Sequence, residues 1–238
     1  MKRVIITGGS SGLGLSFTRA LADLGYNIHM FALDSNEHWL EIAGELANKV
    51  AYTRVDLQQF NKARTALLKS ADIMGGLDIL INNAGVMNFE NAHDAIAESI
   101  SKQLDINLEA PIHLCSVALG IMLKQGIGGQ IINIASVAGL KATPKLAVYA
   151  ASKAGLIHYT RTIAAEYAAK KIRANVICPG AMETALTNRL MFAMIKKGIP
   201  LGEFQTPKEV ASLVVWLMGN DANNVTGSVF SIDGGMSL

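Results

Sequence analysis

Tyr149 and Lys153 stand four residues apart in the segment VYAASKAG, whose other side chains are small or apolar. Residues four apart lie on one face of an α-helix, so a helix here would place the phenol next to the ammonium group. Such a pair could move a proton, because a nearby positive charge favours the phenolate and lowers the pKa of a phenol from about 10. The segment alone is equally compatible with an amphipathic helix that carries a half-buried Tyr and a solvated Lys.

The helix that would carry this pair belongs to an alternation of short apolar strands and longer helical segments. Between the strands, apolar residues recur at intervals of three and four, as at Phe17, Leu21 and Leu24. Strands that are apolar on both sides and joined by helices predict an α/β fold with a doubly wound parallel sheet. No linker or repeat divides the 238 residues, so we expect a single domain. The predicted strands are 3–7, 27–33, 50–55, 77–82, 129–136, 172–179 and 228–233.

The composition narrows the possible classes of protein. Hydrophobic residues make up 50% of the chain and charged residues 17%, which predicts a folded globule. The net charge is only +2 and the basic residues are scattered, so we expect no nucleic-acid partner. No apolar stretch approaches the roughly 20 residues that span a bilayer, so we expect a protein without a membrane segment. Cys115 and Cys178 lack the spacing of a metal site or disulfide pair, which predicts buried thiols in the cytoplasm.

A glycine-rich segment, TGGSSGLG at 7–14, follows the first predicted strand and precedes a helix. Gly8, Gly12 and Gly14 allow the backbone to turn tightly and to approach a bound group closely. The free N–H groups at the start of the helix favour a phosphate. The segment therefore predicts a binding site for a dinucleotide pyrophosphate, with a plain tight turn as the alternative.

Six motifs along the chain resemble those of the short-chain dehydrogenase/reductase family. They are TGGSSGLG, NNAG at 82–85, Ser136 in IASVAG, YAASK at 149–153, PGAMET at 179–184 and the terminal SIDGG. Their order and approximate spacing are similar too, and the chain is closest in character to the 3-oxoacyl-[acyl-carrier-protein] reductase type. The resemblance implies a Rossmann sheet of seven parallel strands with helices on both faces. It also implies NAD(P)-dependent interconversion of a ketone and a secondary alcohol.

The resemblance implies four catalytic residues. Tyr149 would be the general acid or base, with Lys153 beside it to supply positive charge. Ser136 would donate a hydrogen bond to the substrate oxygen. Asn107 would hold a water molecule that links Lys153 to solvent.

The resemblance also implies a cofactor site, a substrate site and no metal site. Asp56 would meet the adenine, Asn83 would hold neighbouring strands together, and Thr184 would contact the nicotinamide carboxamide. Taken singly, Asp56 is better explained as a turn residue at a strand end, and Asn82 and Asn83 as a turn before Gly85. The implied cofactor residues are Gly8, Ser10, Ser11, Gly12, Leu13, Gly14, Asp34, Asp56, Leu57, Asn83, Ala84, Gly85, Tyr149, Lys153, Pro179, Gly180, Met182 and Thr184. The implied substrate residues are Ser136, Ala138, Tyr149 and Met182.

The choice between NAD(H) and NADP(H) rests on the end of the second predicted strand. One register places the uncharged Ala32 and Leu33 at the deciding position, and a register shifted by two places Asp34 there. A shift of two preserves the side on which a side chain lies, so both registers are allowed. A carboxylate at Asp34 would repel the 2′-phosphate, which favours NAD(H), whereas acyl-carrier-type reductases commonly use NADP(H).

The remaining expectations concern the substrate and the partners. The segment 184–204 breaks the strand and helix rhythm, which predicts a small lid over the substrate or, alternatively, a surface hairpin. The expected substrate-side residues are mostly small or apolar, which predicts a mainly apolar carbonyl or alcohol. A carrier-protein partner would find Lys141, Lys145 and Arg173 near the entrance, although a solvated surface is the better explanation for each. Apolar helices around 98–125 and 148–170 resemble the pairing faces of family members, which implies a homotetramer or homodimer.

Two other functions stay open. A dinucleotide-sensing regulatory protein would keep the fold without turnover, but it predicts damage to the four catalytic residues, and all four are intact. A dehydratase or epimerase could use the same site with a tightly held cofactor. Consumption of NAD(P)H in the presence of a ketone would separate the oxidoreductase from both.

Overall fold

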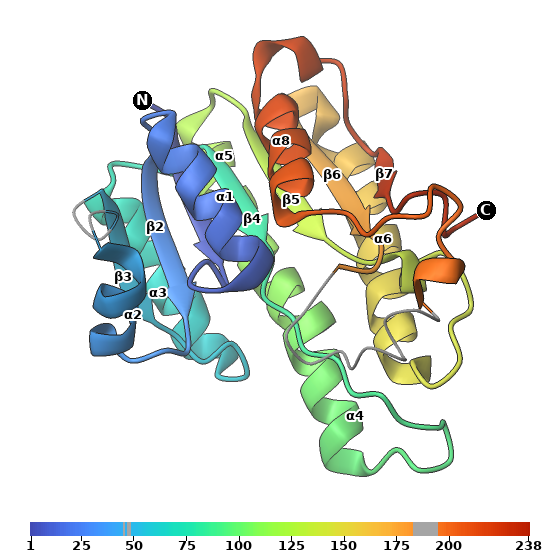
Figure 1. The fold of residues 1–238 in the computed structure, drawn as a ribbon. Helices are drawn as coiled ribbons and strands as arrows, with labels where there is room; N and C mark the ends of the chain where they lie inside the picture. The colour runs from blue at the N-terminus through green and yellow to red at the C-terminus, as the bar shows by residue number, and fades with distance from the viewer. Residues whose placement is uncertain (45, 47–48, 183–194) are drawn as a thin grey trace.

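The computed structural model describes residues 1–44, 46, 49–182 and 195–238, whose strands form one seven-stranded sheet (Figure 1). The order across the sheet is β3-β2-β1-β4-β5-β6-β7, and every neighbouring pair is parallel. This confirms the predicted α/β Rossmann-type fold. The strands are β1 (Arg3–Thr7), β2 (Asn27–Ala32), β3 (Val50–Arg54), β4 (Ile79–Asn82), β5 (Gly129–Ile134), β6 (Ile172–Pro179) and β7 (Val229–Ile232).

Helices cover both faces of the sheet, and in Figure 1 α1 and α8 lie in front of it. The α-helices of the described residues are α1 (Gly12–Asp23), α2 (Asn36–Ala43), α3 (Phe60–Ile73), α4 (Ala97–Leu104), α5 (Ala110–Gln125), α6 (Ala147–Tyr167) and α8 (Pro207–Met218). Shorter helical elements are η2 (Asp105–Glu109), η3 (Val137–Gly139), η4 (Ala168–Lys170) and η5 (Asn220–Ala222).

The core consists of two main apolar clusters, one on each face of the sheet. In β1, Ile5 belongs to the cluster under α3, α5 and α6, whereas Val4 and Ile6 belong to the cluster under α1 and α8. This alternation follows from the period of two in a strand. Because both faces are covered, the strands are apolar throughout, and their carboxyl ends open on one common edge.

One helical segment of the described residues, Ala97–Gln125, is long and apolar enough to cross a membrane by length and composition alone. The sequence does not show it as one continuous apolar stretch, because the segment joins α4, η2 and α5 and its polar residues interrupt the apolar run. Its most apolar window is 56% buried, and Leu114, Cys115 and Ala118 lie in the core. That burial is the pattern of a core helix.

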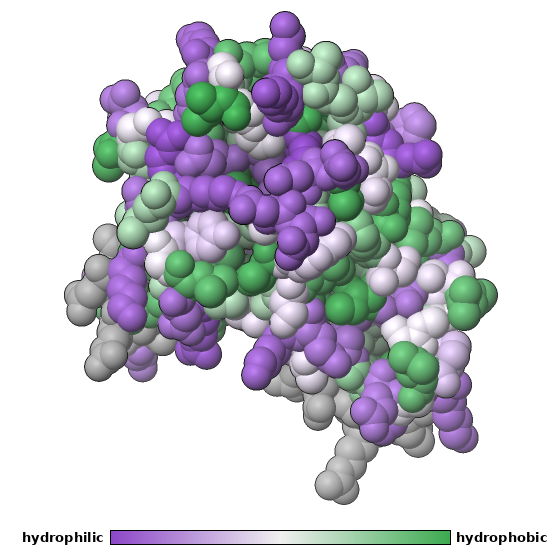
Figure 2. Space-filling view, turned by 90° about the horizontal axis from the view of Figure 1, so that it is seen from above, coloured by the Kyte–Doolittle hydropathy of each residue, from purple (hydrophilic) through white to green (hydrophobic). Residues whose placement is uncertain are grey.

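The edge of the sheet where the strands begin carries side chains that cap the end of α8. Lys2 donates to the carbonyl of Met218 (2.9 Å), and Arg173 and Gln130 each donate to that of Leu217 (2.9 Å). Cations at this helix end satisfy free carbonyls and interact favourably with the helix dipole. Figure 2 looks on to this edge and shows hydrophilic side chains spread across it.

This capping corrects one prediction. Arg173 stands at the start of β6, the edge opposite to the one where Ser136 and Tyr149 lie. A carrier-protein contact was expected to flank the entrance of the site, and Arg173 does not lie there. The predicted strand 172–179 already places Arg173 at this edge, and the prediction was wrong because it was made without reference to that strand.

A buried histidine lies on β2, away from the strand ends. The side chain of His29 is 5% exposed, and its Nε2 contacts Thr53 Oγ1 at 2.7 Å and Ser70 Oγ at 3.3 Å. Its Nδ1 is buried and has no hydrogen-bond partner among the residues that the structure describes. Burial lowers the pKa of His29, so the folded protein holds the ring neutral.

We expect this histidine to make the protein less stable in mild acid. The ring takes up a proton more readily in the unfolded chain, where the pKa of His is about 6.5. The contribution of the neutral ring to the free energy of unfolding is therefore present above that pH and is lost as the pH falls. Between pH 7 and 5.5 the loss should be on the order of 1 kcal/mol, or a Tm shift of about 2–4 °C. His29→Gln should flatten this part of the Tm profile, and His93→Gln, at an exposed site, should not. Equal profiles for all three proteins would contradict the prediction.

Candidate active site

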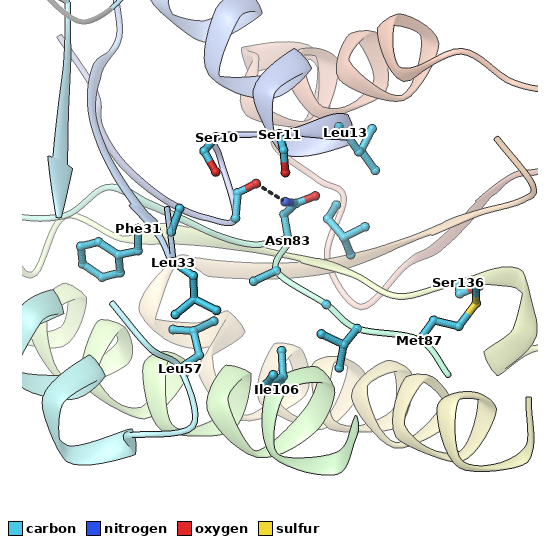
Figure 3. Close-up of a pocket in the computed structure, with 18 of the residues that line it drawn as sticks. Ser10, Ser11, Leu13, Phe31, Leu33, Leu57, Asn83, Met87, Ile106 and Ser136 are labelled. Atoms are coloured by element: carbon cyan, nitrogen blue, oxygen red, sulfur yellow. Dashed lines mark hydrogen bonds between the residues drawn. The ribbon is translucent and has the colours of Figure 1, made fainter. Parts of the chain in front are cut away.

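A cavity of about 520 Å³ opens at the carboxyl ends of the strands (Figure 3). It brings together nearly all the residues that the sequence analysis singled out. The predicted residues that line it are Gly8, Ser10, Ser11, Gly12, Leu13, Gly14, Asp34, Asp56, Leu57, Asn83, Ala84, Gly85, Ser136, Tyr149, Lys153, Pro179, Gly180 and Met182.

Three predicted residues do not line the cavity as described. Asn107 is buried behind it. Ala138 is 6% exposed and is not among the residues that line the cavity, so its contact with a substrate stays a prediction. Thr184 lies outside the described residues, and so does most of the expected lid, whose remaining part at 195–204 places Ile199 in contact with the C-terminal segment.

The glycine-rich loop forms one wall of the cavity. Gly8 and Gly12 have φ angles of +64° and +49°, which L side chains rarely adopt. A Cβ atom on Gly14 would lie 2.0 Å from the Gly8 carbonyl oxygen, so the loop packs against α1 at a distance that only glycine permits. Ser11 starts α1 in an extended conformation, and its side chain does not cap the helix. The first N–H groups of α1 therefore remain suited to a bound anion.

Asn83 fastens this loop to the end of β4. Its side-chain Nδ2 donates to the carbonyl oxygens of Thr7 (3.0 Å) and Gly8 (3.1 Å), and its backbone N–H donates to Thr7 Oγ1 (3.0 Å). Figure 3 draws the bond from Asn83 to the loop. The contact joins two strands that are neighbours in space but far apart in the chain.

Asp34 lies where β2 leaves the sheet, beside the glycine loop. Its carboxylate accepts a hydrogen bond from Ser10 Oγ, and its backbone carbonyl accepts one from the Tyr52 hydroxyl. Arg54 donates to the carbonyl of Leu33 (3.0 Å) at the exposed margin of this region. A carboxylate and a guanidinium therefore both stand near the position that decides cofactor choice.

We expect Asp34 to disfavour a 2′-phosphate, so that wild-type protein has the lower Michaelis constant for NADH. Asp34→Ala should lower the constant for NADPH by roughly tenfold, because a like-charge repulsion is removed. The measurement is the pair of Michaelis constants in each variant, with Asp23→Ala, at an exposed position on α1, as the control. A strong NADPH preference in wild type would show that Arg54, not Asp34, governs this margin.

Asp56 lies on the adjacent strand end, after β3. One carboxylate oxygen accepts the backbone N–H of Gln58 (3.0 Å) and the other accepts the Gln59 side chain (3.1 Å). Asp56 thus has the turn role that the sequence analysis gave as the alternative. It also lines the cavity. Its contact with the adenine stays a prediction.

Tyr149 and Lys153 lie one turn apart on α6, with the Lys153 Nζ atom 5.7 Å from the centroid of the Tyr149 ring. Lys153 is only 3% exposed, and its Nζ donates to the carbonyl oxygen of Ile134 at 3.0 Å. Burial lowers the pKa of Lys153 to about 8. An amine that is buried this deeply and held by one carbonyl is a typical functional group.

The pKa of Tyr149 differs from the expectation. Burial raises it, and the largest opposing effect is a hydrogen bond with the Ser136 side chain, not the charge of Lys153. The prediction assumed that the ammonium acts directly on the phenol. In the structure its Nζ is directed to the Ile134 carbonyl. The phenol therefore holds its proton at neutral pH.

Ser136 follows β5 and caps the short helix η3. Its Oγ accepts the backbone N–H of Ala138 (3.2 Å), which fixes the side chain beside Tyr149. Figure 3 shows Met87 extending toward Ser136 from the segment after β4. A substrate carbonyl placed against these groups would meet two hydroxyls and an apolar wall.

Asn107 stands in the π-helical turn η2, between α4 and α5. Its Oδ1 accepts the backbone N–H of Val86 (2.9 Å), its Nδ2 donates to the Val86 carbonyl (2.8 Å), and Nδ2 also contacts Ser152 Oγ (3.2 Å). A Cβ atom on Gly85 would lie 3.1 Å from Asn107 Oδ1 and 3.4 Å from Lys153 Nζ, so the two groups flank this glycine. Single π-helical turns of this kind often occur at functional sites.

The sequence analysis missed apolar residues that complete the lining. Val86 and Met87 directly follow the NNAG motif, and their place beyond the end of β4 could have indicated them. The others are Phe31, Val55, Ile106, Ile134 and Ala135, whereas Ala32 and Leu33 also line the cavity and were considered only for the choice of cofactor. Most lie at strand ends or in η2, where an apolar residue has the same pattern as a core residue.

Comparisons with known proteins agree with this geometry. A family model described as enoyl-(acyl carrier protein) reductase matches residues 8–237. The chain is 31% identical to a 3-oxoacyl-[acyl-carrier-protein] reductase FabG of Chlamydia muridarum, covering 99% of this chain and 97% of the relative. It is 34% identical to a D-beta-hydroxybutyrate dehydrogenase of Rhizobium meliloti, covering 98% of each.

A solved structure of a variant of a Serratia marcescens short-chain dehydrogenase/reductase superposes with a TM-score of 0.92. It is 27% identical to this chain and covers 100% of this chain and 98% of that one. The sheet order, the sequence matches and the solved fold therefore agree over nearly the whole length. The chain belongs to the short-chain dehydrogenase/reductase family, whose members are oxidoreductases that use NAD(P)(H) and act on ketone and alcohol groups.

Proposed function

We propose that this protein reduces a small, mainly apolar ketone to a secondary alcohol, with Tyr149 as the proton donor. The observation that carries the proposal is the meeting of Tyr149, Ser136 and Lys153 in the same cavity as the glycine-rich loop. A hydride transfer to a carbonyl carbon needs a proton on the oxygen in the same event, and only a positioned acid can supply it.

The cavity wall fits the phosphates of a nicotinamide dinucleotide. Gly12 faces open space, where a Cβ would meet nothing within 4 Å, and the adjoining N–H groups of α1 favour negative charge. Gly8, Gly12 and Gly14 would hold the phosphates, Asp34 would meet the ribose, and Pro179 and Gly180 would border the ring. When bound, the dinucleotide supplies or accepts the hydride.

The proton chemistry follows from the two hydroxyls. Burial keeps the pKa of Tyr149 raised, so the phenol is protonated at neutral pH and can donate to a carbonyl oxygen. Ser136 would stabilise the negative charge that develops on that oxygen. These features favour reduction near neutral pH, and oxidation of an alcohol should need a more alkaline solution that removes the phenol proton.

Lys153 and Asn107 would hold the return path of the proton. Both are buried and both flank Gly85. With its pKa lowered to about 8, Lys153 can give up and regain a proton in the physiological range. Water held near Asn107 would connect it to solvent.

Apolar groups determine the substrate class that we propose. Met87 and Met182 are adaptable side chains in the lining, which suits an unbranched apolar group beside the carbonyl.

A carrier protein stays a possible partner. Lys141 donates to the carbonyls of Met236 (2.9 Å) and Leu238 (3.2 Å), and Lys145 stands 5.5 Å from the centre of the Phe89 ring. Each of these lysines is thus already engaged within the chain.

The deciding experiment measures loss of NADH or NADPH absorbance with purified protein and a panel of carbonyl compounds. The panel should contain short ketones, 3-oxoacid esters, 3-oxoacyl thioesters and an enoyl thioester. We expect stoichiometric consumption with a ketone or 3-oxo compound. Dinucleotide binding without consumption by any carbonyl would refute the proposal in favour of a sensor, and consumption with the enoyl compound alone would assign a different reduction.

We further propose a homotetramer in the cytoplasm, on the family resemblance. Light scattering of purified protein at micromolar concentration should give a mass near four times 25.3 kDa. A monomer under these conditions would refute it.

A further inference from the structure

Two buried asparagines and a threonine form a chain of hydrogen bonds behind the cavity. Asn82 and Asn133 are register partners in β4 and β5 and are 2% and 0% exposed. Asn82 Nδ2 donates to Asn133 Oδ1 at 2.8 Å, and Asn133 Nδ2 donates to Thr160 Oγ1 on α6 at 2.8 Å. The Thr160 hydroxyl donates onward to the carbonyl of Leu156 at 2.6 Å. Buried bonds of this kind fix geometry, because leaving one partner unpaired is costly.

The same strand and the same helix meet at a second point. Lys153 donates to the carbonyl of Ile134, the residue that follows Asn133 in β5. Thr160 follows Lys153 by seven residues, which is about two turns, so both lie on one face of α6. Strand β5 and helix α6 are thus tied at two neighbouring pairs, residues 133 with 160 and 134 with 153.

Apolar packing alone does not fix how a helix is rotated or how far it slides along its axis. The face of α6 against the sheet presents aliphatic side chains such as Leu156, Ile157 and Ile163, whose contacts have no direction. A hydrogen bond weakens steeply with angle and distance. The hydrogen bond at Thr160 is therefore suited to fix both the rotation of α6 about its axis and its position along that axis.

We propose that Asn133 and Thr160 are positioning residues, whose hydrogen bond sets α6 so that Lys153 reaches the Ile134 carbonyl and Tyr149 faces the cavity. Neither residue lines the cavity, so they act through Lys153 and Tyr149. The inference rests on the proposed catalytic role of this pair, but its central contact can be tested separately.

The test compares two substitutions of the same type on the same helix. Thr160→Val removes the hydroxyl with little change of shape. Thr162→Val is the control, because exposed Thr162 makes the same back-bond, to the carbonyl of His158 at 3.1 Å, without any strand partner. We expect kcat to fall roughly ten- to a hundredfold in Thr160→Val, as for a small misplacement of a catalytic group. Thr162→Val should keep wild-type kcat, and Thr160→Ser should recover most of it.

A second readout does not depend on turnover. In protein labelled with ¹³C at lysine Cε, the resonance of Lys153 reports its titration by NMR. Loss of the carbonyl acceptor disfavours the ammonium, so Lys153 should titrate at lower pH in Thr160→Val than in wild type and in Thr162→Val. If the valine variant does not fold, Thr160→Ala allows the same comparison.

The outcomes separate the inference from the proposed function. A lower Tm in Thr160→Val with unchanged kcat and unchanged Lys153 titration would overturn the inference, because the contact would then only stabilise the fold. Equal effects of the two valine substitutions would also overturn it. Full turnover in Lys153→Met would instead refute the proposed catalytic role, while a shifted Lys153 titration in Thr160→Val would still establish the positioning contact.

Discussion

Tyr149→Phe should reduce the rate of carbonyl reduction by about 10²–10⁴-fold. The substitution removes a single oxygen atom and keeps the ring that packs beside Lys153, so the helix and the cavity should keep their shape. The loss should appear in kcat, with little change in dinucleotide affinity, because the proton donor acts only in the reaction. Steady-state kinetics with the preferred ketone, together with a fluorescence titration of NADH or NADPH, measure both quantities.

The matched control for this variant is Tyr167→Phe, at the far end of the same helix. It removes the same atom away from the cavity and should leave kcat within about twofold of wild type, the usual range for a remote surface change. If Tyr149→Phe turned over as fast as Tyr167→Phe, the proton would have to come from another group, and the assignment of the site would be wrong.

Gly14→Ala should abolish tight dinucleotide binding and destabilise the protein. The added Cβ would lie 2.0 Å from the Gly8 carbonyl oxygen and 2.5 Å from Asn83 Nδ2, so backbone and loop must separate. Overpacking of this kind costs about 1–3 kcal/mol, which corresponds to roughly a 5- to 150-fold loss if it falls on binding. Isothermal titration with the dinucleotide measures the loss of affinity, and a thermal melt measures the loss of stability.

Gly120→Ala provides the comparison, because Gly120 is also a helical glycine with a negative φ angle but has nothing within 4 Å of its added Cβ. There the substitution should raise Tm, since alanine favours a helix by about 1 kcal/mol over glycine. The same Gly→Ala change should therefore lower Tm in α1 and raise it in α5. A tolerated Gly14→Ala would mean that the loop can move away from the helix without loss.

The strands were predictable because burial on both faces makes them short apolar runs. Their predicted bounds differ from the observed ones by at most two residues at either end, as at β5, where Ala135 and Ser136 were included but lie beyond the strand. Ser136 has a polar role that follows from this position, since it leaves the ladder and caps η3. The motif glycines were equally readable, because a positive φ or a close approach admits few other residues.

The parts that could not be predicted depend on tertiary packing. The sequence gives no sign that Lys153 turns to the Ile134 carbonyl, because that acceptor comes from a strand end about twenty residues away. The π-helical turn at Asn107 was also hidden, since its residues continue the pattern of an ordinary helix.

The bond between Asn83 and Thr7 has a consequence for how the chain folds during synthesis. The two residues are 76 positions apart, because β4 pairs with β1 after two other strands have been made. A nascent chain released only as far as α3 carries the glycine-rich loop without the partner that holds it. We therefore expect ribosome-bound chains to acquire nucleotide affinity abruptly, once β4 has emerged and the long-range pairing has formed.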